Sequence, residues 1–191
     1  MATLNKLVAW GFSIISFSQA QAFELRVHGV VTEYLSGSVI TNALVRVYKD
    51  GVKQNAEETG ILGLYAVKLD NNARYVIRFS APGHQTKCFS VDTHGLAWEG
   101  DNKTKDLFVE MTLFERISDM DLNYFDLPMG MARFQPATGL VTWDEEYDSR
   151  IRAEVQAIMG EYERRMTATA DASSSKGSDQ AVRSKHSLRA R

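Results

Sequence analysis

The chain has 191 residues, a formal net charge of -2, and a composition that is 44% hydrophobic and 24% charged. This near-balanced charge excludes a strongly basic nucleic-acid-binding protein, and we expect no nucleic-acid partner. Cys88 is the single cysteine, so an internal disulfide is excluded and stability must come from a buried core. A reactive thiol, an intermolecular disulfide and a cysteine without a role all stay open for Cys88.

The first 22 residues have the three parts of a secretory signal peptide. Lys6 supplies a positive start, residues 7–17 are an apolar run, and Ala20-Gln21-Ala22 is a small-x-small cleavage site. A membrane anchor is the alternative, but spanning a bilayer takes about twenty apolar residues. We expect cleavage after Ala22, a periplasmic or secreted protein, and no transmembrane segment after cleavage.

Residues 23–115 are predicted to form an antiparallel β-sandwich. Phe23, Leu25, Val27 and Val31 fall on one face of the first segment, and polar residues fall on the other. The same alternation returns at 43–47, 65–69, 75–79 and 89–91, with turn residues at 49–51, 70–72 and 81–83. Val45, Val67 and Ile77 are predicted to point inward.

Residues 116–166 are predicted to form an extension of the sandwich. Residues 105–115 are predicted to form one long strand that is apolar on both faces, so it is either central in a sheet or covered by the segment that follows it. Segments 128–134 and 140–143 then form a small β-hairpin across 135–139. Thr142 and Glu145 have the capping-box spacing of a helix start.

An amphipathic helix is predicted to follow the hairpin. Its apolar positions recur at helical spacing and form one stripe: Tyr147, Ile151, Val155, Ile158, Met159, Tyr162 and Met166. Such a stripe must be buried, either on the chain's own sandwich or in the groove of a partner. In the second case Ile151, Val155, Ile158, Met159 and Tyr162 are the partner-binding residues.

Residues 167–191 are predicted to form a disordered basic tail. Their first part is rich in Ala, Ser and Thr and offers almost nothing to bury. Five Lys and Arg residues oppose two Asp residues in this tail. A solvated tail and a weak contact with anionic surfaces both stay open.

Three segments carry a resemblance to a known family. They are 27–32 with 42–47 (VHGVVT, NALVRV), 63–67 (GLYAV) and 79–84 (FSAPGH). In order and spacing they resemble the carboxypeptidase regulatory-like domain, whose pattern is G-x-V-x-D, A-x-V-x-V, G-x-Y-x-V and a G-Y turn. The sequence departs from it at His84, where an aromatic residue is usual, and at Glu33, near the usual Asp. The resemblance implies a transthyretin-type sandwich that acts as a non-catalytic interaction domain.

The second half carries a further resemblance. Segments 91–93, 109–115 and 139–147 are similar to small exported proteins of Bacteroidota. This resemblance implies a location in a Gram-negative cell envelope and no particular activity.

Motifs of catalysis and metal binding are incomplete. Asp119, Asp121 and Asn123 have the spacing that opens a calcium loop, but Tyr124 and Gly130 stand where that loop needs Gly and Glu. The spacing of His28, His84 and His94 does not predict the convergence of ligands that zinc needs. We expect no catalytic residue, no metal and no cofactor.

We therefore expect an exported, non-catalytic β-sandwich module that mediates protein–protein interaction in a Gram-negative envelope assembly. The first alternative is a glycan-binding module that uses Trp98, Tyr34 or Tyr48 as stacking aromatics, with Trp143 as a further aromatic of this kind. The second is a transthyretin-type hydrolase, whose family ends in Tyr-Arg-Gly-Ser, whereas residues 187–191 here are SLRAR.

Overall fold

The computed structural model describes residues 24–95, 104–135, 138 and 140–187, with the side chains of the C-terminal helix as far as Thr169. The predicted signal peptide and Trp98 lie outside these residues.

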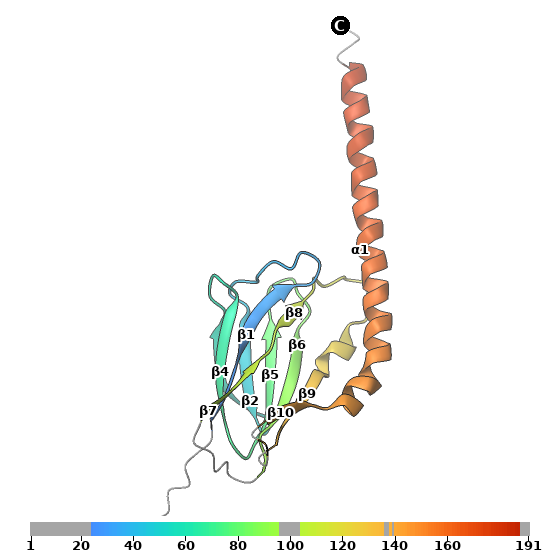
Figure 1. Cartoon of the computed structure of the whole chain (residues 1–191). Coiled ribbons are helices and arrows are strands. Elements are labelled where there is room, and N and C mark those ends of the chain that lie inside the picture. The colour runs from blue at the N-terminus through green and yellow to red at the C-terminus, as the bar shows by residue number, and fades with distance from the viewer. Residues whose placement is uncertain (1–23, 96–103, 136–137, 139, 188–191) are drawn as a thin grey trace, which may run out of the picture.

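Within the described residues, two β-sheets pack face to face as a sandwich (Figure 1). In the smaller sheet, β1 (Glu24–Glu33) pairs with β4 (Leu64–Asp70) on one side and with β7 (Thr104–Phe108) and β8 (Met111–Leu113) on the other. The larger sheet runs in the order β10 (Leu140–Trp143), β9 (Pro128–Gln135), β6 (Lys87–Asp92), β5 (Arg74–Ser80), β2 (Leu44–Lys49), β3 (Val52–Glu58). The predicted mainly β sandwich with one C-terminal helix, α1 (Glu145–Ser187), is confirmed.

Burial follows the alternation read from the sequence. In β5, Tyr75, Ile77 and Phe79 are buried, whereas the residues between them are not. The three predicted inward positions, Val45, Val67 and Ile77, all belong to the same core cluster between the sheets. The core of the sandwich therefore sits where a period of two places it.

Strand pairing is mixed, not purely antiparallel. The consecutive pairs β2–β3, β5–β6 and β9–β10 are antiparallel, as are β1–β4 and β2–β5. The pairs β1–β7, β1–β8 and β6–β9 are parallel. Parallel pairs join segments that are distant in sequence, which local turn signals do not reveal.

The long strand expected over 105–115 is interrupted between β7 and β8. The carbonyl oxygen of Val109 turns inward and accepts a hydrogen bond from the Tyr65 hydroxyl at 2.7 Å. A Cβ atom at Gly29 would lie 1.9 Å from this oxygen, so only glycine leaves room for it. The interruption is therefore built by a close approach between β1 and residue 109.

Strand β3 was not predicted from the sequence. Its residues, VKQNAEE, are almost all exposed because β3 is the edge of the larger sheet. A strand without a buried face lacks the alternation by which strands are recognised.

The predicted hairpin of 128–134 and 140–143 is confirmed as β9 and β10. It does not form a separate extension, because β9 pairs in parallel with β6 and continues the larger sheet. The larger sheet therefore extends through β9 and β10, past the β8 edge of the smaller sheet.

Helix α1 begins two residues later than predicted, since its N-cap is Asp144 and not Thr142. The Asp144 carboxylate accepts a hydrogen bond from the backbone N–H of Tyr147 at 2.9 Å, so Asp144 is the N-cap. Thr142 is not the cap, because it is still paired with Arg133 in the hairpin.

The helix also continues beyond the predicted boundary at Thr167, as far as Ser187 (Figure 1). The sequence predicts a disordered tail there, but this segment contains several alanines and no proline. Once a helix is nucleated on a packed body, such residues allow it to propagate.

Among the described residues, no helix has the length and apolar character needed to cross a bilayer.

Candidate functional site

The apolar stripe of α1 packs on its own chain. Tyr162 is fully buried and Ile151 is nearly so, and the other three predicted partner-binding residues, Val155, Ile158 and Met159, are partly buried. Tyr162, Val155, Ile158 and Met159 belong to the helix-docking cluster, which we define by its buried members Phe114, Leu122, Phe125 and Tyr162. Of the two alternatives left open by the sequence, the structure shows the intramolecular one.

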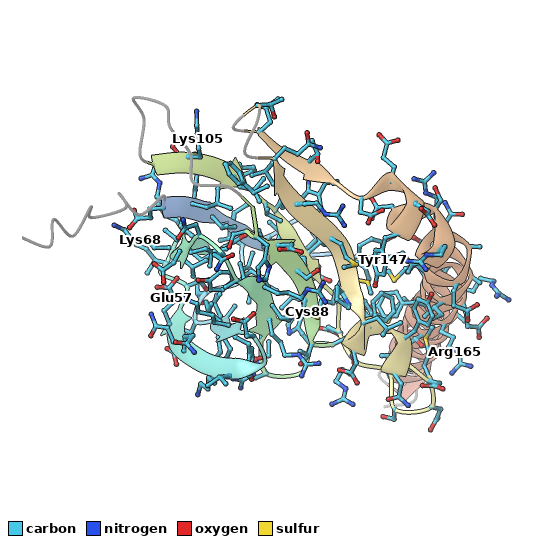
Figure 2. The ribbon with its side chains drawn as sticks, turned by 90° about the horizontal axis from the view of Figure 1, so that it is seen from below. Glu57, Lys68, Cys88, Lys105, Tyr147 and Arg165 are labelled. Atoms are coloured by element: carbon cyan, nitrogen blue, oxygen red, sulfur yellow. The ribbon has the colours of Figure 1, made fainter. Side chains whose placement is uncertain are left out.

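Polar contacts fix the helix at several points along its length. Near its start, the Tyr147 hydroxyl donates to the carbonyl oxygen of Pro128 at 2.8 Å, and Figure 2 shows Tyr147 between α1 and the sheet. Near its middle, the Tyr34 hydroxyl donates to Glu163, and Arg165 donates to the carbonyl oxygen of Asp119 at 2.9 Å. These bonds hold α1 in one orientation on the sandwich.

Tyr162 is the centre of the helix-docking cluster. Its ring centroid lies 4.9 Å from that of Phe114, in a tilted arrangement. Its buried hydroxyl has no hydrogen-bond partner among the described residues. Burial raises the pKa of Tyr162, and the nearby charges of Glu33 and Glu115 raise it further.

The aromatic residues predicted to bind glycans do not form one platform. Tyr34 follows the end of β1 and makes a T-shaped contact with Tyr162. Tyr48 lies near the β2–β3 turn, at the opposite end of the sandwich. Trp98 lies outside the described residues.

The histidines are dispersed in the described structure. His28 Nε2 lies 3.9 Å from Asp106 Oδ1, and His94 Nδ1 lies 2.7 Å from Asp92 Oδ1. His84 Nδ1 lies 2.8 Å from the carbonyl oxygen of Pro82. Among the described residues, no group of three or more His, Cys, Asp or Glu side chains could hold a metal ion. In the calcium-like segment, the Asp121 carboxylate accepts a bond from the backbone N–H of Asn123.

Cys88 is buried, with its sulfur 3.6 Å from the carbonyl oxygen of Asp126. It lies on the outer face of β6, the face opposite to Phe89 and Val91, as the alternation predicts. Burial raises the pKa of its thiol, which disfavours the reactive thiolate.

One end of the sandwich exposes aliphatic side chains from two neighbouring loops and the start of β4. We call this set the apolar end surface: Leu35, Val39, Ile61, Leu62 and Leu64. Ile61 is the most exposed of them, at 85%. Such a concentration of large aliphatic groups is uncommon on a surface that contacts only water.

The loops of the apolar end surface are held in place by backbone hydrogen bonds. Val31 donates to Gly63 and accepts from Ile40, both at 2.9 Å, and Gly63 closes a turn onto Gly60 at 2.9 Å. These bonds fix both loops to the end of β1. The aliphatic tips are therefore presented by an ordered backbone.

A hollow of about 450 Å³ adjoins this surface on the outer face of the smaller sheet. It is lined by the exposed apolar side chains of Leu64 and Phe108 and by the charged residues Arg26, Glu57 and Glu58. The Glu57 carboxylate accepts a hydrogen bond from the backbone N–H of Ala66 at 3.3 Å, which covers part of the β4 edge.

A second polar feature is the inward-pointing Lys87 at the start of β6. Its ammonium donates to the carbonyl oxygen of Thr112 at 2.7 Å and lies 5.7 Å from the ring centroids of Phe114 and Phe125. Burial lowers the pKa of Lys87 to about 8. The Lys87 side chain therefore reaches from β6 in the larger sheet to β8 in the smaller sheet.

Sequence reasoning missed Lys87 and the Ile61-Leu62 pair. Lys87 is in phase with Phe89 and Val91, so alternation places it inward, but a lysine at a strand end is usually taken as exposed. Ile61 and Leu62 lie between two glycines at a turn, where apolar residues are unusual. This unusual composition is the sequence signal that could have identified an exposed apolar pair.

No family model and no curated protein matches the chain. Solved structures with partial similarity include hydroxyquinol 1,2-dioxygenase from Pseudomonas putida, at 11% identity and a TM-score of 0.36, covering 49% of this chain and 57% of that one. The dioxygenase domain of a dioxygenase carbohydrate-binding protein fusion from Streptomyces sp. SirexAA-E is 10% identical, with a TM-score of 0.39, and covers 52% of this chain and 84% of that one. The Bacillus anthracis TIE protein is 12% identical, with a TM-score of 0.40, and covers 49% of this chain and 17% of that one. Likenesses this distant carry no argument about activity.

Proposed function

We propose that this protein is an exported, non-catalytic β-sandwich module that binds another protein of a Gram-negative cell envelope. The observation that carries the proposal is the apolar end surface, with Ile61 85% and Leu62 63% exposed on an ordered turn. Burying such side chains in a partner releases about 25 cal/mol per Å² of apolar area. Because the backbone is already ordered, little of this energy is spent on fixing the loops.

The contact we propose differs from the helix stripe considered from the sequence. The stripe residue Tyr162 is buried in the chain's own helix-docking cluster, and Ile151 is buried as well. The apolar end surface, by contrast, has large aliphatic groups facing solvent. Leu64 joins it to the outer face of the smaller sheet, so the edge strand β4 is part of the proposed contact.

The address in the envelope rests on the N-terminal sequence and on the resemblance to the carboxypeptidase regulatory-like domain. N-terminal sequencing of the native protein should start near Phe23. An intact Met1 start in the envelope fraction would contradict export.

The interaction is tested with the double variant Ile61→Asp, Leu62→Asp in a pulldown from the native envelope. Val52→Asp is the matched control, because Val52 is also 63% exposed but lies by the β2–β3 turn, away from this end. We expect the double variant to lose the partner that wild type and Val52→Asp both recover, with unchanged melting temperatures. Equal recovery by all three proteins would refute the proposal.

A further inference from the structure

The larger sheet overhangs the smaller one, and a hollow lies beneath the overhang. The hollow has a volume of about 410 Å³ and is lined by residues from β6, the β8 edge, β9, β10 and the first turn of α1. A second hollow of about 260 Å³ shares Lys87, Met129 and Asp148 with it as lining residues. The first volume is within the range of about 300–1,000 Å³ that is usual for small-molecule sites.

Two groups of opposite charge line this hollow without pairing with each other. One oxygen of the Asp148 carboxylate is buried and has no hydrogen-bond partner among the described residues. Lys87 gives one of its three donors to the carbonyl oxygen of Thr112. A buried carboxylate oxygen without a donor is costly, so Asp148 favours a ligand that can donate a hydrogen bond to it.

An indole ring forms one wall. Trp143 lies so close over Gly130 that a Cβ atom at residue 130 would be 2.9 Å from its Cζ3 atom. Phe89 contacts the ring edge-to-face, with centroids 6.1 Å apart. Although it is held in this way, Trp143 stays 39% exposed, which leaves part of its aromatic surface free for a ligand.

The chemistry of the walls restricts the ligand. An anion such as phosphate would be repelled by Asp148 and by Glu110, which also lines the hollow. A metal cation would be repelled by Lys87, and an apolar ligand would leave the Asp148 oxygen unpaired. A neutral ligand with hydroxyl groups and one apolar face meets every requirement, because a hydroxyl both donates and accepts.

We propose that this hollow binds a pyranose ring with free hydroxyl groups, either as a free sugar or as a residue of a glycan chain. The C–H face of the ring stacks on the indole of Trp143, whose π face is negative. A hydroxyl donates to the free oxygen of Asp148, and another accepts from Lys87. The site is distinct from the apolar end surface, which contributes no residue to it.

Calorimetric titration of the full chain tests this site. The probes are the methyl glycosides of glucose, galactose, mannose and N-acetylglucosamine, and one disaccharide of each sugar. We expect at least one probe to bind. Asp148→Asn keeps the shape of the side chain and removes the acceptor charge, and we expect it to weaken binding by about tenfold or more. Lys87→Met should weaken binding similarly, and Trp143→Ala should abolish it.

Controls separate binding from folding. Ile61→Asp changes a residue outside the hollow and should bind the probe as wild type does. Circular dichroism melts of each variant identify any loss due to unfolding, and Asp148→Asn provides the decisive comparison if Trp143→Ala does not fold. Equal affinity for the monosaccharide and disaccharide identifies a free sugar, and a tighter disaccharide identifies a glycan chain. Failure of every probe to bind wild type in the millimolar range, or unchanged affinity of Asp148→Asn and Lys87→Met, would overturn the proposal.

Discussion

Removing the charge of Lys87 should change how stability depends on pH. Burial lowers the pKa of this amine from 10.5 to about 8. The drop corresponds to about 3 kcal/mol by which the folded state disfavours the ammonium relative to the unfolded state. Below the folded pKa both states are protonated, so this penalty is fully present at neutral pH. Between about 8 and 10.5 the unfolded state holds more protons, so stability rises with pH until the penalty is gone.

The perturbation that isolates this effect is Lys87→Met, which keeps an apolar stem and removes the amine. Other charged groups line the same hollows, namely Asp148, Glu110 and Arg152, but they are present in both proteins and cancel in the difference. Urea denaturation at several pH values gives the free energy of unfolding of each protein.

We expect wild type to gain about 2 kcal/mol relative to Lys87→Met between about pH 7 and pH 9.5. At neutral pH the variant should be as stable as wild type or more so, because the lost hydrogen bond to Thr112 is worth only about 1 kcal/mol. A wild-type-minus-variant difference that stays flat over this pH range would refute the account of Lys87 as a desolvated ammonium.

Three further predictions concern stability. Tyr162→Ala should lower the free energy of unfolding by about 3–5 kcal/mol, because it leaves a cavity in the helix-docking cluster. Tyr162→Phe should be neutral or stabilising, because it removes an unpartnered hydroxyl. Equal losses of the two variants in urea denaturation would be inconsistent with this account. Gly29→Ala should lower the free energy of unfolding by more than about 3 kcal/mol, since its Cβ would collide with the Val109 carbonyl oxygen. A variant that melts at the wild-type temperature would show that residue 29 and this oxygen are not in close contact. Val67→Ala should cost about 2–4 kcal/mol and the outward Lys68→Ala about 0.5 or less, so equally mild melts would show that the inward assignment is wrong.

Features encoded by neighbouring residues were predictable from the sequence. The inward positions of β5, Tyr75, Ile77 and Phe79, follow from alternation alone. The hairpin of β9 and β10 follows from two short apolar segments around a turn. In each case the physical signal lies within about ten residues, and a single sequence contains it in full.

Pairings between distant segments could not be predicted in this way. The parallel contact of β6 with β9 brings Ser90 beside Met131, and no local pattern specifies that neighbour. The interruption at Val109 depends on a glycine on another strand, Gly29. The hollow at Lys87 and Asp148 exists only because the sheet continues past its partner, so its residues share no sequence motif.

The helix stripe shows the same limit for function. A stripe such as Ile151 to Tyr162 indicates that a helix face must be buried, but not what covers it. The cover is the segment from Phe114 to Phe125, which the sequence does not distinguish from a loop. Because the stripe is covered, the partner contact that we propose lies on another part of the surface.

Helix α1 still contributes to the proposed contact, because it supports the loop that carries part of it. Tyr34 begins that loop, and its backbone N–H donates to the carbonyl oxygen of Leu113 at 2.7 Å while its hydroxyl donates to Glu163 of α1. Leu35 follows Tyr34 directly and Val39 lies five residues after Tyr34, and both belong to the apolar end surface. A loop anchored at its first residue loses less conformational entropy when a partner covers it. Folding has then already met part of the entropy cost of binding. In this proposal the amphipathic helix supports the recognition surface, and the exposed aliphatic side chains of the sandwich end form that surface.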